Sequence, residues 1–316
     1  MRAEYREEPC RSALNKVSGM SFKWSLNPYT GCAHRCTFCF VRAFEKRADR
    51  PFDDRYGASI RVKTNLVEVL RRELSRPRWA HEQVVIGTAT DPYQPAEGRY
   101  RLTRRSIEAL TEARNPLSII TRGPLIVRDV DVLVEAARRA PVAVTFSIPT
   151  LDPEIVRRTE PGTAPPRQRL RALTALVDAG IEATVGMAPI LPGLSDRPEL
   201  LADVVKAARD AGATAVWTNV LYLRPGTREH FLANLARDWP ELMPRYERLY
   251  DGRAYLPKST IEPVRREVAD LRQRLEIADR RRVRILPLPP PADPEQLELT
   301  LPDRQPAEPT RAARAG

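Results

Sequence analysis

The sequence predicts an α/β fold, specifically a partial (β/α)6 TIM-like barrel with parallel strands, a helical C-terminal extension and a disordered tail. Short apolar segments recur roughly every 30 residues, as strands do in β/α folds. Segments with helical apolar spacing alternate with them, which is typical of right-handed βαβ units and a parallel sheet. About six units fit, too few for a complete eightfold barrel. A doubly wound sheet is the alternative, although no Gly-rich dinucleotide motif follows a strand.

The six expected strands are apolar or β-branched runs, at residues 25–29, 84–87, 117–121, 142–146, 182–186 and 215–220. Apolar residues at helical spacing predict helices between the strands, at residues 60–74, 103–114, 125–139, 166–179 and 198–211. Residues 44–56 are charged and irregular, which predicts a loop.

We expect four parts along the chain. An N-terminal extension covers residues 1–23, the barrel covers 24–225, a helical region covers 226–284 and a Pro-rich tail covers 285–316. The helical region holds residues 227–250, with a break near Pro240, and a strongly charged helix at 261–283. The tail is rich in Pro and Ala and poor in apolar residues, so we expect it to be disordered.

Composition narrows the class of protein. No run of about 18 apolar residues is present and the N-terminus lacks an apolar signal segment, so we expect no membrane association and a cytoplasmic location. Low, clustered cysteine content argues against a disulfide framework. The net charge is +11. Either an arginine-rich solvated surface or attraction to nucleic acid explains it.

Three of the four cysteines fall inside eight residues, as C-x3-C-x2-C formed by Cys32, Cys36 and Cys39, whereas Cys10 lies well upstream. Crowded thiolates repel one another and oxidise unless something binds them. Three soft thiolates on a short loop suit an iron–sulfur cluster. Because a cubane has four irons, three cysteines leave one iron open to another ligand.

Two other metal sites compete with this interpretation. A zinc site usually needs four protein ligands, and His34, between the first two cysteines, would be strained as the fourth. A ferredoxin-type cluster would need Cys10 as its fourth ligand. A loop after the first strand of a β/α barrel lies at the face where barrel enzymes carry out chemistry, which favours a three-cysteine cubane with a small-molecule ligand.

The cysteine motif, with an aromatic residue before its last cysteine, resembles that of the radical S-adenosylmethionine (radical SAM) enzymes. Longer segments resemble the branch related to spore photoproduct lyase, often described as DNA-repair photolyase-like. These are NPYTGC at 27–32, IRVKTN at 60–65 and TATDPYQ at 88–94. The resemblance extends over residues 20–250.

The resemblance implies that Cys32, Cys36 and Cys39 bind three irons of a 4Fe–4S cluster and that SAM chelates the fourth. One electron from the cluster would cleave SAM, and the resulting 5′-deoxyadenosyl radical would abstract hydrogen from an unidentified substrate, with nucleic acid as one candidate. An electron donor such as flavodoxin or ferredoxin is expected. The alternatives are an iron–sulfur electron-transfer or cluster-scaffold protein without SAM chemistry, and a zinc-stabilised nucleic-acid-binding module. Oligomeric state is not predicted.

Further positions match expected SAM contacts in that family. Phe38 matches the aromatic residue near the adenine, Thr90 a polar contact, and Ser147 a serine. Arg122 replaces a lysine that reaches the SAM carboxylate, and arginine would keep the charge. Leu221 belongs to the last-strand segment expected to flank the adenine. Each also has a structural alternative, a hydrophobic anchor for Phe38 and a strand or helix cap for Thr90, Arg122 and Ser147.

Departures from the lyase concern its hydrogen donor. The lyase has a donor cysteine after its second strand, and Thr88 occupies that position here. Asp91 and Tyr93 are candidate catalytic residues in the following polar run, with Tyr93 as radical relay or hydrogen donor. The alternative is a proline-bracketed turn held together by its carboxylates. The three histidines are scattered and are expected on the surface, namely His34, His81 and His230.

Overall fold

A computed structural model describes residues 3–277 of the chain. Its main sheet has seven strands in the order β10-β9-β8-β7-β6-β3-β2. From β2 to β10 these strands are Leu14–Lys16, Trp24–Leu26 (β3), Val84–Ile86 (β6), Leu117–Thr121 (β7), Val142–Ser147 (β8), Glu182–Ile190 (β9) and Ala215–Val220. Neighbours from β3 to β10 pair in parallel, and β2 is antiparallel to β3.

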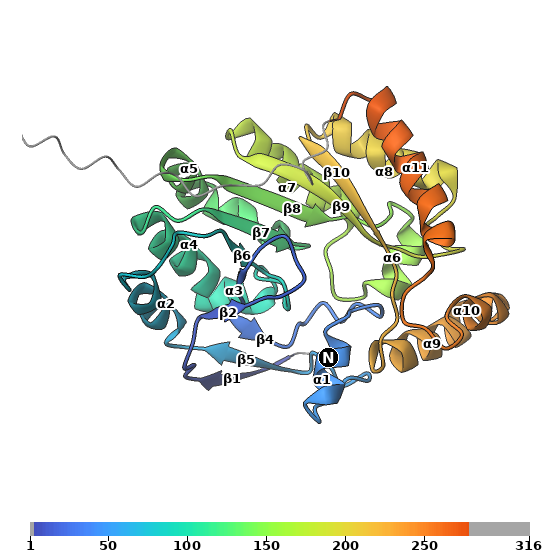
Figure 1. Ribbon diagram of the computed structural model, residues 1–316, viewed down its shortest axis with the longest axis horizontal. Coiled ribbons are helices and arrows are strands. Elements are labelled where there is room, and N and C mark those ends of the chain that lie inside the picture. Colours follow the sequence, from blue (N-terminus) through green and yellow to red (C-terminus); the bar gives the residue numbers. More distant parts are fainter. Residues whose placement is uncertain (1–2, 278–316) are drawn as a thin grey trace, which may run out of the picture.

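The predicted partial barrel is therefore confirmed, since β3 and β6 to β10 are the six expected strands. The sheet curves but does not close, because β10 and β2 end the strand order (Figure 1). Consecutive parallel strands are joined through helices, as βαβ units require. Their carboxyl ends consequently gather along one edge.

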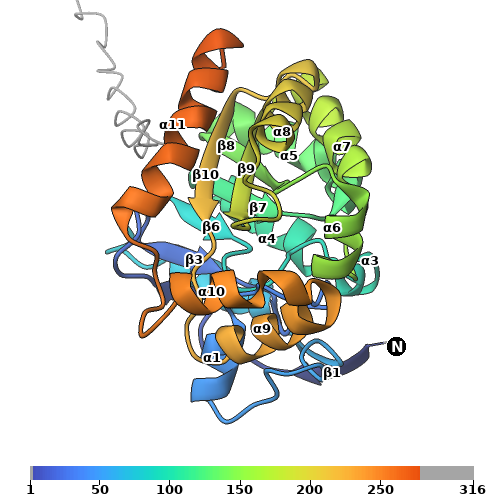
Figure 2. The same cartoon turned by 90° about the vertical axis from the view of Figure 1, so that its right-hand side faces the viewer.

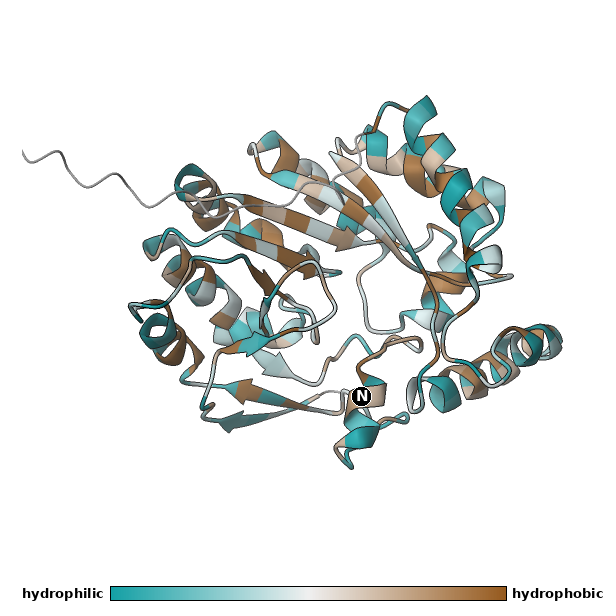
Figure 3. Ribbon diagram, in the orientation of Figure 1, coloured by the Kyte–Doolittle hydropathy of each residue, from teal (hydrophilic) through white to brown (hydrophobic). Residues whose placement is uncertain are grey.

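Helices cover the outer face of the sheet. They are α2 (Leu66–Leu74), α3 (Pro95–Tyr100), α4 (Leu102–Glu112), η1 (Pro124–Asp129, a 3₁₀ helix), α5 (Val130–Arg139), α6 (Pro153–Thr159), α7 (Pro166–Asp178) and α8 (Pro198–Asp210). Figure 3 shows that α5, for example, carries both apolar and hydrophilic residues. In α8, Leu201, Val204, Val205 and Ala208 are buried, which is the i, i+3, i+4, i+7 spacing of one helix face.

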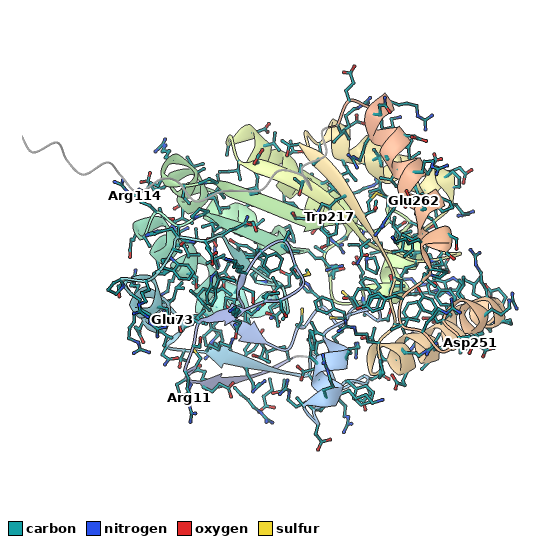
Figure 4. All side chains as sticks on the ribbon, viewed as in Figure 1. Arg11, Glu73, Arg114, Trp217, Asp251 and Glu262 are labelled. Atoms are coloured by element: carbon teal, nitrogen blue, oxygen red, sulfur yellow. The ribbon has the colours of Figure 1, made fainter. Side chains whose placement is uncertain are left out.

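Strand β10 packs closely on β9 because a glycine leaves room for an indole ring. Trp217, labelled in Figure 4, is paired in register with Gly186 on β9. A Cβ built on Gly186 would lie 2.7 Å from the Trp217 ring. Any larger residue at this position would displace the Trp217 ring.

A second, three-stranded sheet in the order β1-β5-β4 was not predicted. Its strands are Glu4–Glu8 (β1), Tyr29–Thr30 (β4) and Ser59–Lys63 (β5). The expected helix at 60–74 is therefore wrong in its first part, and helix begins at Leu66. Ile60 and Val62 are buried in alternation, a strand period that precedes the helical one.

Several other segments differ from the sequence expectation. The N-terminal extension, expected to lack a period, forms β1 and β2, and residues 44–56 are partly helical because α1 covers Arg42–Arg47. The predicted first strand, 25–29, is split into β3 and β4. Helices α3 and α6 were not expected, and both begin at a proline, which favours a helix start.

The C-terminal region follows the prediction more closely. Helices α9 (Thr227–Asp238) and α10 (Met243–Leu249) are separated by η2 (Pro240–Leu242), so the break lies at Pro240. Helix α11, Lys258–Arg274, packs beside α8 and β10 (Figure 2). The expected helix at 261–283 is too long, because α11 ends at Arg274 and residues 275–277 are not helical. Residues 278–283 and the tail at 285–316 lie outside the described residues. Within residues 3–277, no helix combines the length and apolar character needed to cross a membrane.

Candidate active site at the cysteine loop

The cysteine loop, residues 31–40, leaves β4 and leads into α1. Cys32 and Cys36 are buried, and Cys39 is half-buried. The loop opens at Gly31, whose φ of +86° suits glycine, and a Cβ there would lie 2.8 Å from the Ser59 carbonyl oxygen on β5. Only glycine meets both conditions without displacing the small sheet.

Two polar side chains fix the path of the loop. Gln94 donates to the Gly31 carbonyl (3.1 Å) and accepts from the Ala33 N–H (3.0 Å). The buried guanidinium of Arg42 donates to the carbonyl oxygens of Phe52 (2.6 Å) and Asp53 (2.7 Å). It also lies 3.4 Å from the carbonyl oxygen of Cys36 and from that of Arg35. Such charge-assisted bonds to backbone position a loop without tight secondary structure.

A second segment packs directly against the loop. The Gly162 N–H donates to the His34 carbonyl (3.0 Å), and the Thr37 N–H donates to the Thr159 carbonyl (2.8 Å). A Cβ on Gly162 would lie 2.3 Å from the Ala33 carbonyl oxygen. The chain leaving α6 therefore forms part of the wall behind the cysteines.

Burial makes the bare thiols poor thiolates. It raises the pKa of Cys32 to about 12, with Asp91 adding to the effect and the Asp91 and His34 N–H groups opposing it. Burial also raises the pKa of Cys36 well above its ordinary value, although the nearby Arg122 guanidinium opposes the rise. Cys39 adds to both shifts, so the three thiols lie close together. A bound metal supplies the positive charge that deprotonation here requires.

The residues beside the cysteines also fit an iron–sulfur cluster. The Tyr56 and Thr37 hydroxyls are buried and have no hydrogen-bond partner. Tyr56 packs in one apolar cluster with Cys32, and Cys39 lies against that cluster. Orphaned buried donors are rare, and thiolate or sulfide sulfur would satisfy them.

The thiols are arranged differently from a mononuclear metal site. Among residues 3–277, no three His, Cys, Asp or Glu side chains converge as ligands of a single ion must. Each iron of a cubane takes one protein thiolate, so a cluster does not need that convergence.

Asp91 organises the loop from the side of β6. Its carboxylate accepts from the Thr121 hydroxyl (2.6 Å), the Arg122 N–H (2.6 Å) and the Tyr93 N–H (2.9 Å), and lies 3.3 Å from His34 Nδ1. Burial alone would raise the pKa of Asp91, but the contacts with His34, Thr121 and the Arg122 N–H outweigh it and lower the pKa to about 2. His34 is therefore buried, which corrects the expectation of a surface histidine.

Arg122 lies next to the cysteine loop. Its guanidinium carbon lies 5.6 Å from the centre of the Phe38 ring. Its Nε donates to Glu160 (2.7 Å), and a terminal nitrogen donates to the Ala188 carbonyl (3.1 Å). Glu160 also accepts from the buried Arg169 (2.6 Å), which in turn donates to the backbone of β8. The charge of Arg122 is thus balanced and its direction is fixed.

The other predicted SAM contacts have the following neighbours. Phe38 and Leu221 belong to one apolar cluster with Cys36. The Thr90 hydroxyl donates to the Tyr29 carbonyl (3.2 Å), and the Ser147 carbonyl accepts from Arg169 (2.9 Å). Both backbone groups of Leu221 are engaged, because its N–H donates to Ile190 and its carbonyl accepts from the Tyr250 hydroxyl. Ligand contact by these residues stays a prediction.

The contacts of Tyr93 and Thr88 support structural roles. Tyr93 is buried, and burial with nearby Asp129 and Glu97 raises the pKa of its hydroxyl well above the ordinary value. The Thr88 hydroxyl accepts from the Asn27 side chain (3.2 Å). The catalytic roles predicted for Asp91 and Tyr93 stay predictions, whereas the contacts are those of the alternative, a turn held by its carboxylates.

Sequence reasoning missed Arg42, Tyr56, Glu160 and Arg169. The cysteine motif gives no signal for them, because they come from α1, the loop before β5 and the segment from α6 to α7. His230, also expected on the surface, is buried on α9. Among the residues around the cysteine loop, only the polar run at 91–97 could be found from the sequence. Gln94 and Asp91 of this run both contact the loop or its neighbours.

Comparison with known proteins gives both family and fold. Residues 26–204 match the model described as the radical SAM superfamily. An uncharacterized protein of Mycobacterium tuberculosis is 43% identical over 289 residues, covering 90% of this chain and 84% of that relative. One of Methanocaldococcus jannaschii is 25% identical over 234 residues, covering 73% of this chain and 82% of the relative.

Among solved structures, a double mutant of spore photoproduct lyase with bound AdoMet and dinucleoside spore photoproduct has a similar fold. The TM-score is 0.65 at 13% identity, with 86% of this chain and 79% of that chain covered. The lyase complexed with dinucleoside spore photoproduct alone gives the same TM-score, 0.65, at 14% identity and the same coverage. At this identity the likeness establishes the fold alone.

Proposed function

Because the chain belongs to the radical SAM superfamily, we propose that Cys32, Cys36 and Cys39 bind three irons of a 4Fe–4S cluster and that SAM ligates the fourth. The bound pair supplies reductive cleavage of SAM, which yields a 5′-deoxyadenosyl radical that abstracts hydrogen from a substrate. An electron donor such as flavodoxin or ferredoxin completes the cycle. The protein orients these groups and excludes water.

The observation that carries the proposal is two buried thiols and one half-buried thiol on one loop, with two orphaned buried hydroxyls beside them. Arg42 and Gln94 hold the backbone of the loop. Arg122 is held beside Cys36 by Glu160, and in the proposed complex its positive charge lies near the SAM carboxylate. Phe38 and Leu221 offer apolar surface on the same side as Cys36, which suits an adenine ring.

The reaction of the lyase on its photoproduct is not part of the proposal. Thr88 stands where the lyase has its hydrogen-donor cysteine, and a hydroxyl is a poor hydrogen-atom donor compared with a thiol. The Thr88 oxygen is also bonded to Asn27. The substrate therefore differs from that of the lyase in the hydrogen donor that it requires after hydrogen abstraction.

Anaerobic reconstitution with iron and sulfide, followed by reduction and addition of SAM, tests the proposal. We expect 5′-deoxyadenosine and methionine in equal amounts, measured by chromatography. A bound cluster that leaves SAM intact would support the electron-transfer or scaffold alternative. Zinc in place of iron after purification would refute the proposal.

A further inference from the structure

Four aromatic side chains form a continuous row beside the cysteine loop, which we call the aromatic row. Phe40 ends the cysteine loop, Phe44 lies on α1, Tyr222 follows β10, and Tyr255 lies before α11. Ring centres are 5.8 Å apart for Phe40–Phe44, 6.4 Å for Phe40–Tyr222 and 5.1 Å for Tyr222–Tyr255. The two tyrosines are stacked, with 20° between their planes.

The aromatic row concentrates exposed apolar surface. Of five large apolar side chains exposed within residues 3–277, three belong to the row, namely Phe40 (36%), Phe44 (40%) and Tyr255 (51%). Single exposed apolar residues are ordinary, but a group of them points to a binding surface.

Backbone contacts fix the three segments that carry the row. The Leu223 N–H donates to the Ala254 carbonyl (2.8 Å), which holds Tyr222 beside Tyr255. The Thr227 hydroxyl donates to the Cys39 carbonyl (3.1 Å), which ties the chain after β10 to the cysteine loop. Figure 2 shows this region, where α1, α9 and the chain leaving β10 meet. The rings are thus pre-organised for a ligand.

Two arginines flank the row at its ends. The guanidinium carbon of Arg47 lies 4.8 Å from the centre of the Phe44 ring, and that of Arg224 lies 5.4 Å from the Tyr255 ring. Both side chains are exposed, and neither forms an ion pair with a carboxylate of the described residues. Neighbouring Lys46, in contrast, pairs with Glu229. Each end of the row therefore has an uncompensated positive charge.

We propose that the aromatic row binds single-stranded nucleic acid, with bases stacked on the rings and phosphates contacted by Arg47 and Arg224. Aromatic faces accept any base, and flanking cations match the phosphate backbone. The net charge of +11 favours the same partner. An acidic protein would satisfy the arginines but would not need a row of exposed rings. Phe40 directly follows Cys39, so a base stacked on Phe40 lies next to the proposed site of radical formation. The role of this base as substrate rests on the proposed function.

Binding of a labelled oligothymidine to the reconstituted full chain without SAM, followed by fluorescence anisotropy, tests the proposal. We expect Tyr255→Ala to weaken binding about tenfold, from one lost stacking contact. Arg224→Gln should weaken it and flatten its salt dependence. Tyr100→Ala is the matched control, because Tyr100 also lies under an arginine, Arg99 (4.8 Å), but on α3. That variant should bind as the parent does.

An abasic oligonucleotide of equal length and charge separates stacking from simple charge attraction. We expect the parent to bind it more weakly than oligothymidine and Tyr255→Ala to bind both alike. The proposal would be overturned if the parent bound both oligonucleotides with equal affinity or bound duplex more tightly than oligothymidine. It would also be overturned if Tyr100→Ala lost as much affinity as Tyr255→Ala. Loss of flavodoxin binding in Tyr255→Ala without any change in oligonucleotide binding would also overturn it, in favour of a docking site for the electron donor. SAM cleavage is measured separately, so its failure would refute the proposed function and leave this binding result standing.

Discussion

Replacing Glu160 with Gln should destabilise the protein far more than the loss of an exposed ion pair. The Glu160 side chain is 1% exposed and accepts from both Arg122 and Arg169. Gln keeps the volume and one acceptor, but it leaves the fully buried Arg169 without a counter-charge. Breaking a buried pair in this way costs about 3–5 kcal/mol of the free energy of unfolding.

Asp131→Asn is the matched control, because Asp131 also binds an arginine, Arg104 (2.6 Å), yet its side chain is 64% exposed. Exposed pairs contribute about 0–1 kcal/mol. Urea unfolding followed by circular dichroism at neutral pH measures both changes. A loss below about 1 kcal/mol for Glu160→Gln, equal to that of the control, would contradict the reasoning that the network beside Cys36 is a compensated buried pair.

Three further outcomes follow from the structure. Tyr56→Phe should lower the cluster's midpoint potential by about 20–60 mV, the equivalent of one hydrogen bond to a cluster sulfur, in an optical redox titration. Tyr246→Phe, which also removes a buried unpartnered hydroxyl, should leave it unchanged, and equal shifts would contradict the assignment. Cys32→Ala should abolish iron binding, whereas Cys10→Ala should retain it, since Cys10 packs on the main core; loss of iron in the second variant would revive the ferredoxin-type alternative. Burial lowers the pKa of His230 from 6.5 to about 4, so the unfolded chain takes up the proton first and stability falls as the pH drops through that range. Between pH 7 and 5 the free energy of unfolding should fall by up to about 2 kcal/mol, measured by urea unfolding. The same pH dependence in the parent and in His230→Gln would contradict this assignment.

The barrel could be predicted from the sequence because each parallel strand reads as a short run of apolar or β-branched residues, even where buried positions alternate with half-buried ones, as in β7 and β8. The small sheet, β1-β5-β4, could not be predicted from the sequence. Only Thr64 and Asn65 separate β5 from α2, so in the sequence the buried Ile60 and Val62 join the helical pattern that starts at Leu66. Strand β1 has few buried residues, and its pairing with β5 depends on tertiary contact.

The candidate cluster ligands could be predicted because the three cysteines lie within eight residues and thiolate chemistry is specific. The residues around the cysteines could not be predicted, because only contact between distant segments brings them together. In the sequence, Arg42 and Tyr56 look like ordinary residues of a charged segment. Only the fold brings them next to the cysteines. The aromatic row likewise joins residues 40 and 255, which no local motif connects.

The central claim is that the three cysteines leave one iron for SAM. Electron–nuclear double resonance of the reduced, reconstituted protein with SAM carrying ¹⁵N in its amino group tests this claim directly. A ¹⁵N coupling to the cluster, absent without SAM and retained in Cys10→Ala, is the predicted result. A reduced cluster whose spectrum is unchanged by saturating SAM would contradict it.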